Sequence, residues 1–220
     1  MWTTFIGYPL GPYSGFFILL IKLNCIIKWI IKRKKERTQT EYLYRHNNIL
    51  KCLYFALLQQ FGIIKTIPPP NSGVEPKPAT KTNDVQILWD IPIYSSGAEM
   101  LTTVEQGNRP DMVVINKKSK TVTVIECSCP WVTNMDRKDK EKPDKYQEVR
   151  AELQRRYHGF HIHQMNVLLD VMGRYGALLK SSLGALLGQN RLAERVLSSM
   201  QKAAVLSSIR IKDLFKAFRF

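Results

Sequence analysis

A hairpin between residues 109 and 131 constrains the fold more than any other stretch of the sequence. The segment RPDMVVINKKSKTVTVIECSCPW contains two apolar runs, residues 111–115 and 121–129, separated by the polar turn NKKSK. So short a connection requires the two strands to pair antiparallel. The start of the first strand then lies beside the end of the second, which places Asp111 beside Glu126. Because side chains alternate along a strand, Glu126 shares a face with Val122 and Val124.

The segments around the hairpin alternate between helical and extended patterns. Apolar residues recur at i, i+3 and i+4 spacing over Glu41 to Gly62, whereas the proline-rich residues 66–84 predict a linker without a packed element. A helix that begins near Lys142 connects the hairpin to another strand, and this βαβ crossover makes the two strands parallel. The sequence therefore predicts an α/β fold with a four-stranded mixed sheet flanked by helices. The remaining predicted elements are strands over 85–93 and 160–171, and C-terminal helices over 173–187 and 191–218.

The first forty residues differ in composition from the rest of the chain. Residues 15–31 are mostly apolar and precede the basic run KRKKER. A membrane span needs roughly 20 apolar residues, and this segment approaches that length only if its two lysines and its asparagine are tolerated. Three hypotheses stay open for it: a membrane span, an amphipathic helix at a surface, and sequence outside the functional domain. We predict an N-terminal extension over 1–40 and a single domain over 41–220.

The net charge of +15 and the pI of about 9.8 predict a polyanionic partner, either nucleic acid or an anionic membrane surface. Residues 1–40 carry seven Lys or Arg and one Glu, so they contribute +6 and the remaining chain contributes +9. The basic run also resembles a nuclear-import patch, which predicts a nuclear location with the membrane as the alternative. The four cysteines form no paired framework, which predicts free thiols in a reducing compartment.

Acidic residues on the predicted strands and lysines on the following helix form the set that phosphodiester hydrolysis needs. Carboxylate oxygens bind Mg²⁺ or Mn²⁺, which activates water, and a lysine offsets the charge that develops on the phosphate. The candidate metal ligands are Asp90, Asp111 and Glu126. The candidate catalytic residues are Asp111 and Glu126 with Lys142 and Lys145. Simpler explanations also exist: an acid at an exposed strand end, a turn cap, or a carboxylate paired with a lysine. We expect no small-molecule cofactor.

Six segments follow one another in the chain: RHNNILK, ILWDIPI, RPDMVVINKK, VIECSCPW, EKPDKYQEVRAEL and LSSMQKAAVLSSIRI. Together they resemble the C-terminal restriction-endonuclease-like domain of non-LTR retrotransposon reverse-transcriptase proteins, a branch of the PD-(D/E)XK superfamily. The resemblance runs from about Tyr42 to Phe218 and implies an αβββαβ core, C-terminal helices and metal-dependent nicking of DNA. The candidate nucleic-acid-binding residues are Arg45, His46 and Arg109, and the alternative for the RHN triplet is a solvated helix face.

The sequence departs from the family pattern at three positions. Residue 126 is Glu where the retroelement copies usually have Asp, Ser128 replaces the superfamily's lysine, and Pro143 separates the two helix lysines. No reverse-transcriptase motif of the YxDD type occurs in the chain. The expected function is a retroelement-derived, metal-dependent DNA endonuclease without the reverse transcriptase. The alternatives are a catalytically inactive nucleic-acid-binding relic and a membrane-anchored protein.

A zinc site is a further alternative, because two cysteines and two histidines alternate along two predicted strands. Cys127 with Cys129 and His161 with His163 would supply a Cys₂His₂ set if the two strands were neighbours. The CxC and HxH spacing is not usual for a zinc finger. Buried thiols and surface histidines explain the same residues.

Overall fold

The computed structural model describes residues 39–69, 72–94, 109–130, 134 and 146–216. The site and its supporting elements belong to the compact unit Tyr44–Phe220. The apolar segment 15–31 and the predicted cations Lys142 and Lys145 lie outside the described residues. Within the described ranges, no helix is long and apolar enough to cross a membrane.

A five-stranded mixed sheet forms the centre of the fold, and its strands follow their sequence order. Neighbouring strands are antiparallel except β4 and β5, which are parallel as the βαβ crossover predicts. The α/β architecture with a mixed sheet is therefore confirmed. The strands are β1 (Ala79–Lys81), β2 (Val85–Trp89), β3 (Met112–Asn116), β4 (Thr121–Ser128) and β5 (His161–Leu168).

The predicted number of four strands is wrong, because β1 lies within residues 66–84, which we predicted to be a linker. β1 pairs with β2 at the edge of the sheet, with Ala79 opposite Leu88 and Lys81 opposite Gln86. Two of its three side chains are exposed, so backbone pairing rather than burial defines this strand. A three-residue edge strand of this kind has no hydrophobic alternation for sequence analysis to detect.

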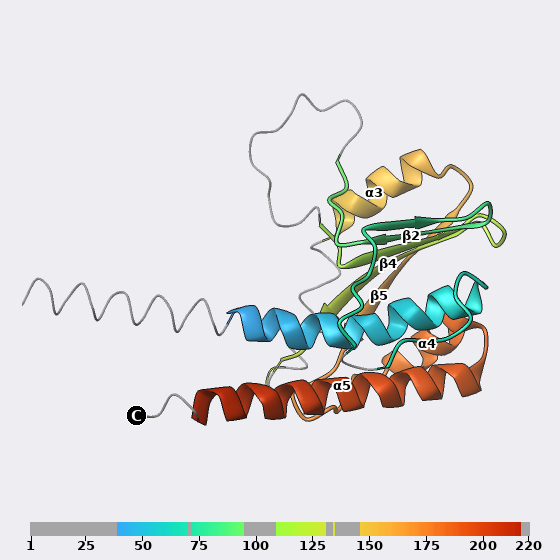
Figure 1. The fold of residues 1–220 in the computed structure, drawn as a ribbon. Coiled ribbons are helices and arrows are strands. Elements are labelled where there is room, and N and C mark those ends of the chain that lie inside the picture. The colour runs from blue at the N-terminus through green and yellow to red at the C-terminus, as the bar shows by residue number, and fades with distance from the viewer. Residues whose placement is uncertain (1–38, 70–71, 95–108, 131–133, 135–145, 217–220) are drawn as a thin grey trace, which may run out of the picture. The chain divides into compact units, whose positions relative to one another are not determined.

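Helices cover both faces of the sheet (Figure 1). One face carries the helix over residues 39–60, α4 (Leu179–Leu187) and α5 (Asn190–Lys216), and the other carries α3 (Gln147–Arg156). The larger core fills the first interface and includes Leu53, Val114 and Met200. The smaller core fills the second interface and includes Val149 and Leu153 of α3. The ends of the central strands therefore lie between two helical layers.

The helix α3 starts later than the sequence predicts. It begins at Gln147 with Tyr146 as its N-cap residue, whereas the predicted start was near Lys142. Tyr146 makes no capping hydrogen bond through its side chain. Its fully buried ring belongs to the same core cluster as Val149 and Leu153. A large aromatic side chain, instead of a polar cap, therefore fixes the entry into this helix.

The helix α4 also starts later than predicted, at Leu179 instead of residue 173. The cause is the fully buried Asp170, whose Oδ1 accepts hydrogen bonds from the backbone N–H groups of Met172 and Arg174 at 2.8 and 2.9 Å. These bonds fold the segment after β5 into a turn. The same turn ends β5 three residues before the end that the apolar pattern predicted.

Candidate active site

Three acidic residues lie in one row across the end of the sheet. Met112 of β3 pairs with Trp89 of β2 on one side and with Ile125 of β4 on the other. The next position in this antiparallel register holds an acidic residue on each of the three chain segments. Asp111 therefore lies between Asp90 and Glu126, and the N–H of Asp90 donates a hydrogen bond to the carbonyl oxygen of Asp111 at 2.9 Å. The register thus brings Asp111 beside Glu126, as the short hairpin turn predicts.

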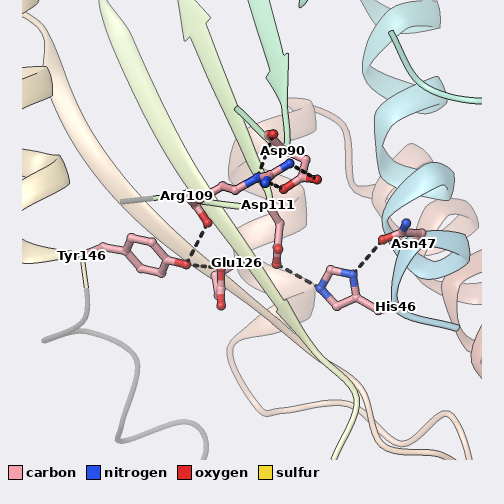
Figure 2. Close-up of polar contacts among 7 residues, drawn as sticks. All are labelled: His46, Asn47, Asp90, Arg109, Asp111, Glu126 and Tyr146. Carbon is pink, nitrogen blue, oxygen red and sulfur yellow. Dashed lines mark hydrogen bonds and ion pairs between the residues drawn. The ribbon is translucent and has the colours of Figure 1, made fainter. Parts of the chain in front are cut away.

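Two groups from different elements hold the carboxylate of Asp111. Its Oδ2 accepts a hydrogen bond from the backbone N–H of Cys127 at 2.6 Å, and it lies 3.0 Å from Nε2 of His46. Cys127 follows Glu126 in β4, whereas His46 reaches in from the helix over 39–60 (Figure 2). The Asp111 side chain retains 20% exposure, so the carboxylate is held but not sealed from solvent.

The contacts of His46 favour its positively charged form. Nδ1 lies 3.0 Å from Oδ1 of Asn47, and Nε2 lies 3.0 Å from Oδ2 of Asp111. With an oxygen atom facing each ring nitrogen, this arrangement suits the imidazolium form, in which both nitrogens donate. Burial acts to lower the pKa of His46, but the hydrogen bond and the negative charge of Asp111, with contributions from Asn47 and Glu126, raise it above its ordinary value. The sequence pointed to this histidine as a nucleic-acid contact and gave no sign of its pairing with Asp111.

Glu126 is buried, and its partner comes from the opposite helical layer. The hydroxyl of Tyr146 donates a hydrogen bond to Oε2 of Glu126 at 2.5 Å, and the carbonyl oxygen of Arg109 lies 3.5 Å from the same hydroxyl. Figure 2 shows Tyr146 and His46 approaching the two carboxylates from opposite sides. Sequence analysis did not single out Tyr146 as a candidate site residue. The KY pair of the EKPDKY motif was the one sequence feature that could have pointed to it.

Asp90 directs its carboxylate to Arg109 and not to the other two acids. Its backbone φ of 51° lies in the left-handed region, which breaks the strand alternation at the end of β2. Oδ1 lies 2.6 Å from Nε of Arg109, and Oδ2 accepts a hydrogen bond from Nη2 at 2.8 Å. The part of the chain that the structure describes contains no group of three His, Cys, Asp or Glu side chains spaced to hold a metal ion. The structure thus places Asp111 beside Glu126, and it pairs the carboxylate of Asp90 with the guanidinium of Arg109.

Arg45, the other candidate for nucleic-acid binding, turns toward the C-terminal helix. Its Nη1 donates a hydrogen bond to Oγ of Ser208 in α5 at 3.4 Å. The guanidinium also forms a hydrogen bond with the thiol of Cys129, where β4 ends. The side chain is half-buried. This contact ties the helix over 39–60 to α5.

The strand register excludes the zinc alternative. His161 and His163 lie opposite Thr121 and Thr123 at the start of β4, whereas the two cysteines follow at its far end. The three described cysteines are free thiols, two of them buried, as predicted. Burial raises the pKa of Cys129 to about 11, so it is a neutral thiol at physiological pH.

The sequence matches no protein-family model and no curated protein. Among solved structures, the chain is similar to an N-terminal domain of a reptarenavirus L protein, with 18% identity and a TM-score of 0.25. The match covers 49% of this chain and 46% of the other, so the chain spans about half the length of that structure. A TM-score this low carries no information about function, and the site has to be interpreted from the residues of this chain.

Proposed function

We propose that this chain is a metal-dependent endonuclease that nicks DNA and derives from the endonuclease domain of a non-LTR retrotransposon. The observation that carries the proposal is the pair Asp111 and Glu126, held side by side at the sheet end by partners from both helical layers. The retroelement origin rests on the order of the sequence motifs. The net charge of +15 supports a nucleic-acid partner, and a DNA substrate in turn favours a nuclear location.

The donor set suits Mg²⁺ or Mn²⁺. Protein sites for Mg²⁺ use one or two carboxylates and leave the other positions to water and to phosphate oxygens of the substrate. Asp111 and Glu126 supply two such carboxylates, so the site does not need Asp90 as a third. When bound, the cation polarises the phosphate and makes water a stronger nucleophile.

The neighbouring groups prepare the two carboxylates for this role. The N–H of Cys127 and the ring of His46 hold Asp111, and the hydroxyl of Tyr146 holds Glu126. The charge on His46 reduces the repulsion between these acids and an approaching phosphate. Lys142 and Lys145 remain our candidates for the cation that stabilises the charge developing on the phosphate during cleavage.

The test is nicking of supercoiled plasmid by the full-length chain. We expect open circles with Mg²⁺ or Mn²⁺ and none with EDTA. Asp111→Ala combined with Glu126→Ala should abolish the nicking. The control is Asp213→Ala, which removes an exposed carboxylate from α5 and should leave nicking unchanged. Nicking that persists in the double variant would contradict the assignment.

A catalytically inactive nucleic-acid-binding protein is the second candidate, and one observation favours it. Ser128 stands at the superfamily's lysine position, is buried at 6% exposure and carries no charge. This candidate predicts salt-sensitive DNA binding without cleavage in either metal ion. Metal-dependent nicking that is lost in the Asp111 and Glu126 double variant would exclude it.

A further inference from the structure

We propose that Tyr146 is a positioning residue, whose buried hydroxyl holds the Glu126 carboxylate in the orientation that binds a divalent cation. The inference rests on the proposed function, because it treats Glu126 as a metal ligand. Tyr146 itself is fully buried, so it does not contact substrate. It acts through Glu126.

The hydrogen bond between these two side chains is short and shielded from water. The hydroxyl oxygen of Tyr146 lies 2.5 Å from Oε2 of Glu126, and the two residues are 0% and 6% exposed. Hydroxyl-to-carboxylate bonds of about 2.5–2.7 Å belong to the stronger, charge-assisted class. Because so little of either residue meets solvent, a water molecule cannot readily replace the hydroxyl.

The tyrosine ring is part of the buried core between α3 and the sheet. Tyr146 is the N-cap residue of α3, and its ring lies in one buried cluster with Val149 and Leu153 of that helix and Val124 of β4. The ring cannot swing away without opening the core between α3 and the sheet. The Glu126 side chain is thus anchored at its carboxylate end by a hydroxyl that is itself packed in the core.

The hydroxyl also keeps its proton. Burial raises the pKa of Tyr146, and the hydrogen bond to Glu126 and the negative charges of Glu126 and Asp111 raise it further. In its bond to Glu126 the hydroxyl is the donor and Oε2 is the acceptor. The geometry therefore assigns the hydroxyl one role, which is to hold Oε2 of Glu126 and leave the other carboxylate oxygen for a cation.

The test compares Mn²⁺ binding to the full-length wild type and to Tyr146→Phe, measured by the electron paramagnetic resonance of free Mn²⁺. Loss of a group that orients a metal ligand typically costs about 10–100-fold in metal affinity. We expect a shift of this size for Tyr146→Phe. Plasmid nicking should need correspondingly more Mn²⁺ but recover toward the wild-type rate at saturating Mn²⁺, because the ligand itself is still present.

Tyr54→Phe is the matched control. Tyr54 is also a buried tyrosine whose hydroxyl forms a hydrogen bond, in this case with Oγ1 of Thr80 at 2.9 Å in β1. Its loss should affect stability but leave Mn²⁺ affinity unchanged. In a Glu126→Gln background, Tyr146→Phe should have no further effect on Mn²⁺ affinity, since the carboxylate that it positions is gone.

The outcomes separate the two proposals. If the wild type binds Mn²⁺ through Asp111 and Glu126 and Tyr146→Phe binds equally well, the positioning role is wrong and the nuclease proposal stands. If the wild type binds no Mn²⁺, both fail. Should Tyr146→Phe not fold, 3-fluorotyrosine at position 146 replaces it: adding Mg²⁺ should shift its ¹⁹F resonance, and the Glu126→Gln variant should abolish the shift. An unchanged resonance in the protein that retains Glu126 would overturn the proposal.

Discussion

At the scale of single residues, the site depends on a few polar contacts that reach across the sheet end. His46 and Tyr146 come from opposite helical layers, and each engages one of the two carboxylates. The histidine contributes a positive charge and the tyrosine a neutral donor. The two carboxylates therefore have different surroundings: Asp111 lies partly open beside a cation, whereas Glu126 lies buried against a hydroxyl.

The pairing of His46 with Asp111 predicts a specific pH dependence of stability. The pKa of His46 is raised in the folded chain, so its stabilising contribution is complete below about pH 6.5 and is lost as pH rises through the raised pKa. Below that pH, the charged hydrogen bond should contribute about 1.5–3 kcal/mol to the free energy of unfolding. Urea unfolding in EDTA from pH 5 to 9 measures this contribution.

The control for this measurement is His46→Gln, which keeps a donor near Asp111 but does not titrate. The stability difference between wild type and His46→Gln should be largest at low pH and should shrink as pH rises. A difference that is constant across the range would show that His46 is neutral in the folded chain, against the pattern of its two acceptors.

At the scale of elements, the turn after β5 is a local structure with a measurable cost. Asp170→Ala should lower the free energy of unfolding by about 2–6 kcal/mol, because two backbone N–H groups lose their acceptor and each costs roughly 1–3 kcal/mol. Urea unfolding checks this value. Asp213→Ala, an exposed aspartate on α5, should change it by less than about 0.5 kcal/mol. Equal effects of the two variants would mean that Asp170 does not hold the turn.

Some helices and strands could be predicted from the sequence and others could not. The hairpin strands are predicted within a residue of their ends, because two apolar runs joined by a short polar turn strongly limit the possible registers. The helix predicted from residue 173 begins only at Leu179, because a buried carboxylate overrides the first part of the helical apolar pattern. β1 escapes detection because its side chains lie outside the core. Local periodicity carries no information on either kind of contact.

The candidate site also contains one arrangement that the sequence predicts and others that it does not. The hairpin register determines from sequence that Asp111 lies beside Glu126. The direction of the Asp90 side chain depends on a left-handed backbone at the end of β2 and on Arg109, nineteen residues away in sequence. The contacts of His46 and Tyr146 with the acids span 65 and 20 residues. Partners this distant follow only from the packing of the two helical layers on the sheet.

At the scale of the whole molecule, the excess of positive charge predicts how DNA binding responds to salt. For the Asp111→Ala and Glu126→Ala double variant, which should bind without cutting, the logarithm of the association constant should fall linearly with the logarithm of the NaCl concentration. The slope should be roughly −0.9 for each phosphate contacted on duplex DNA. Fluorescence anisotropy of a labelled duplex measures it. Binding that does not respond to salt would argue against a phosphate-contacting surface.

The pairing of Asp111 and Glu126 as metal ligands is tested most directly by a crystal of the full-length chain soaked in Mn²⁺ and measured at the manganese absorption edge. The expected result is an anomalous peak between the two carboxylates, about 2.0–2.2 Å from an oxygen of each, close to the distances typical of a small divalent cation in an oxygen site. The peak should be absent from a Glu126→Gln crystal treated in the same way. A wild-type crystal in which Mn²⁺ binds only elsewhere, or in which no Mn²⁺ is bound by the two carboxylates, would contradict the proposed metal-dependent site.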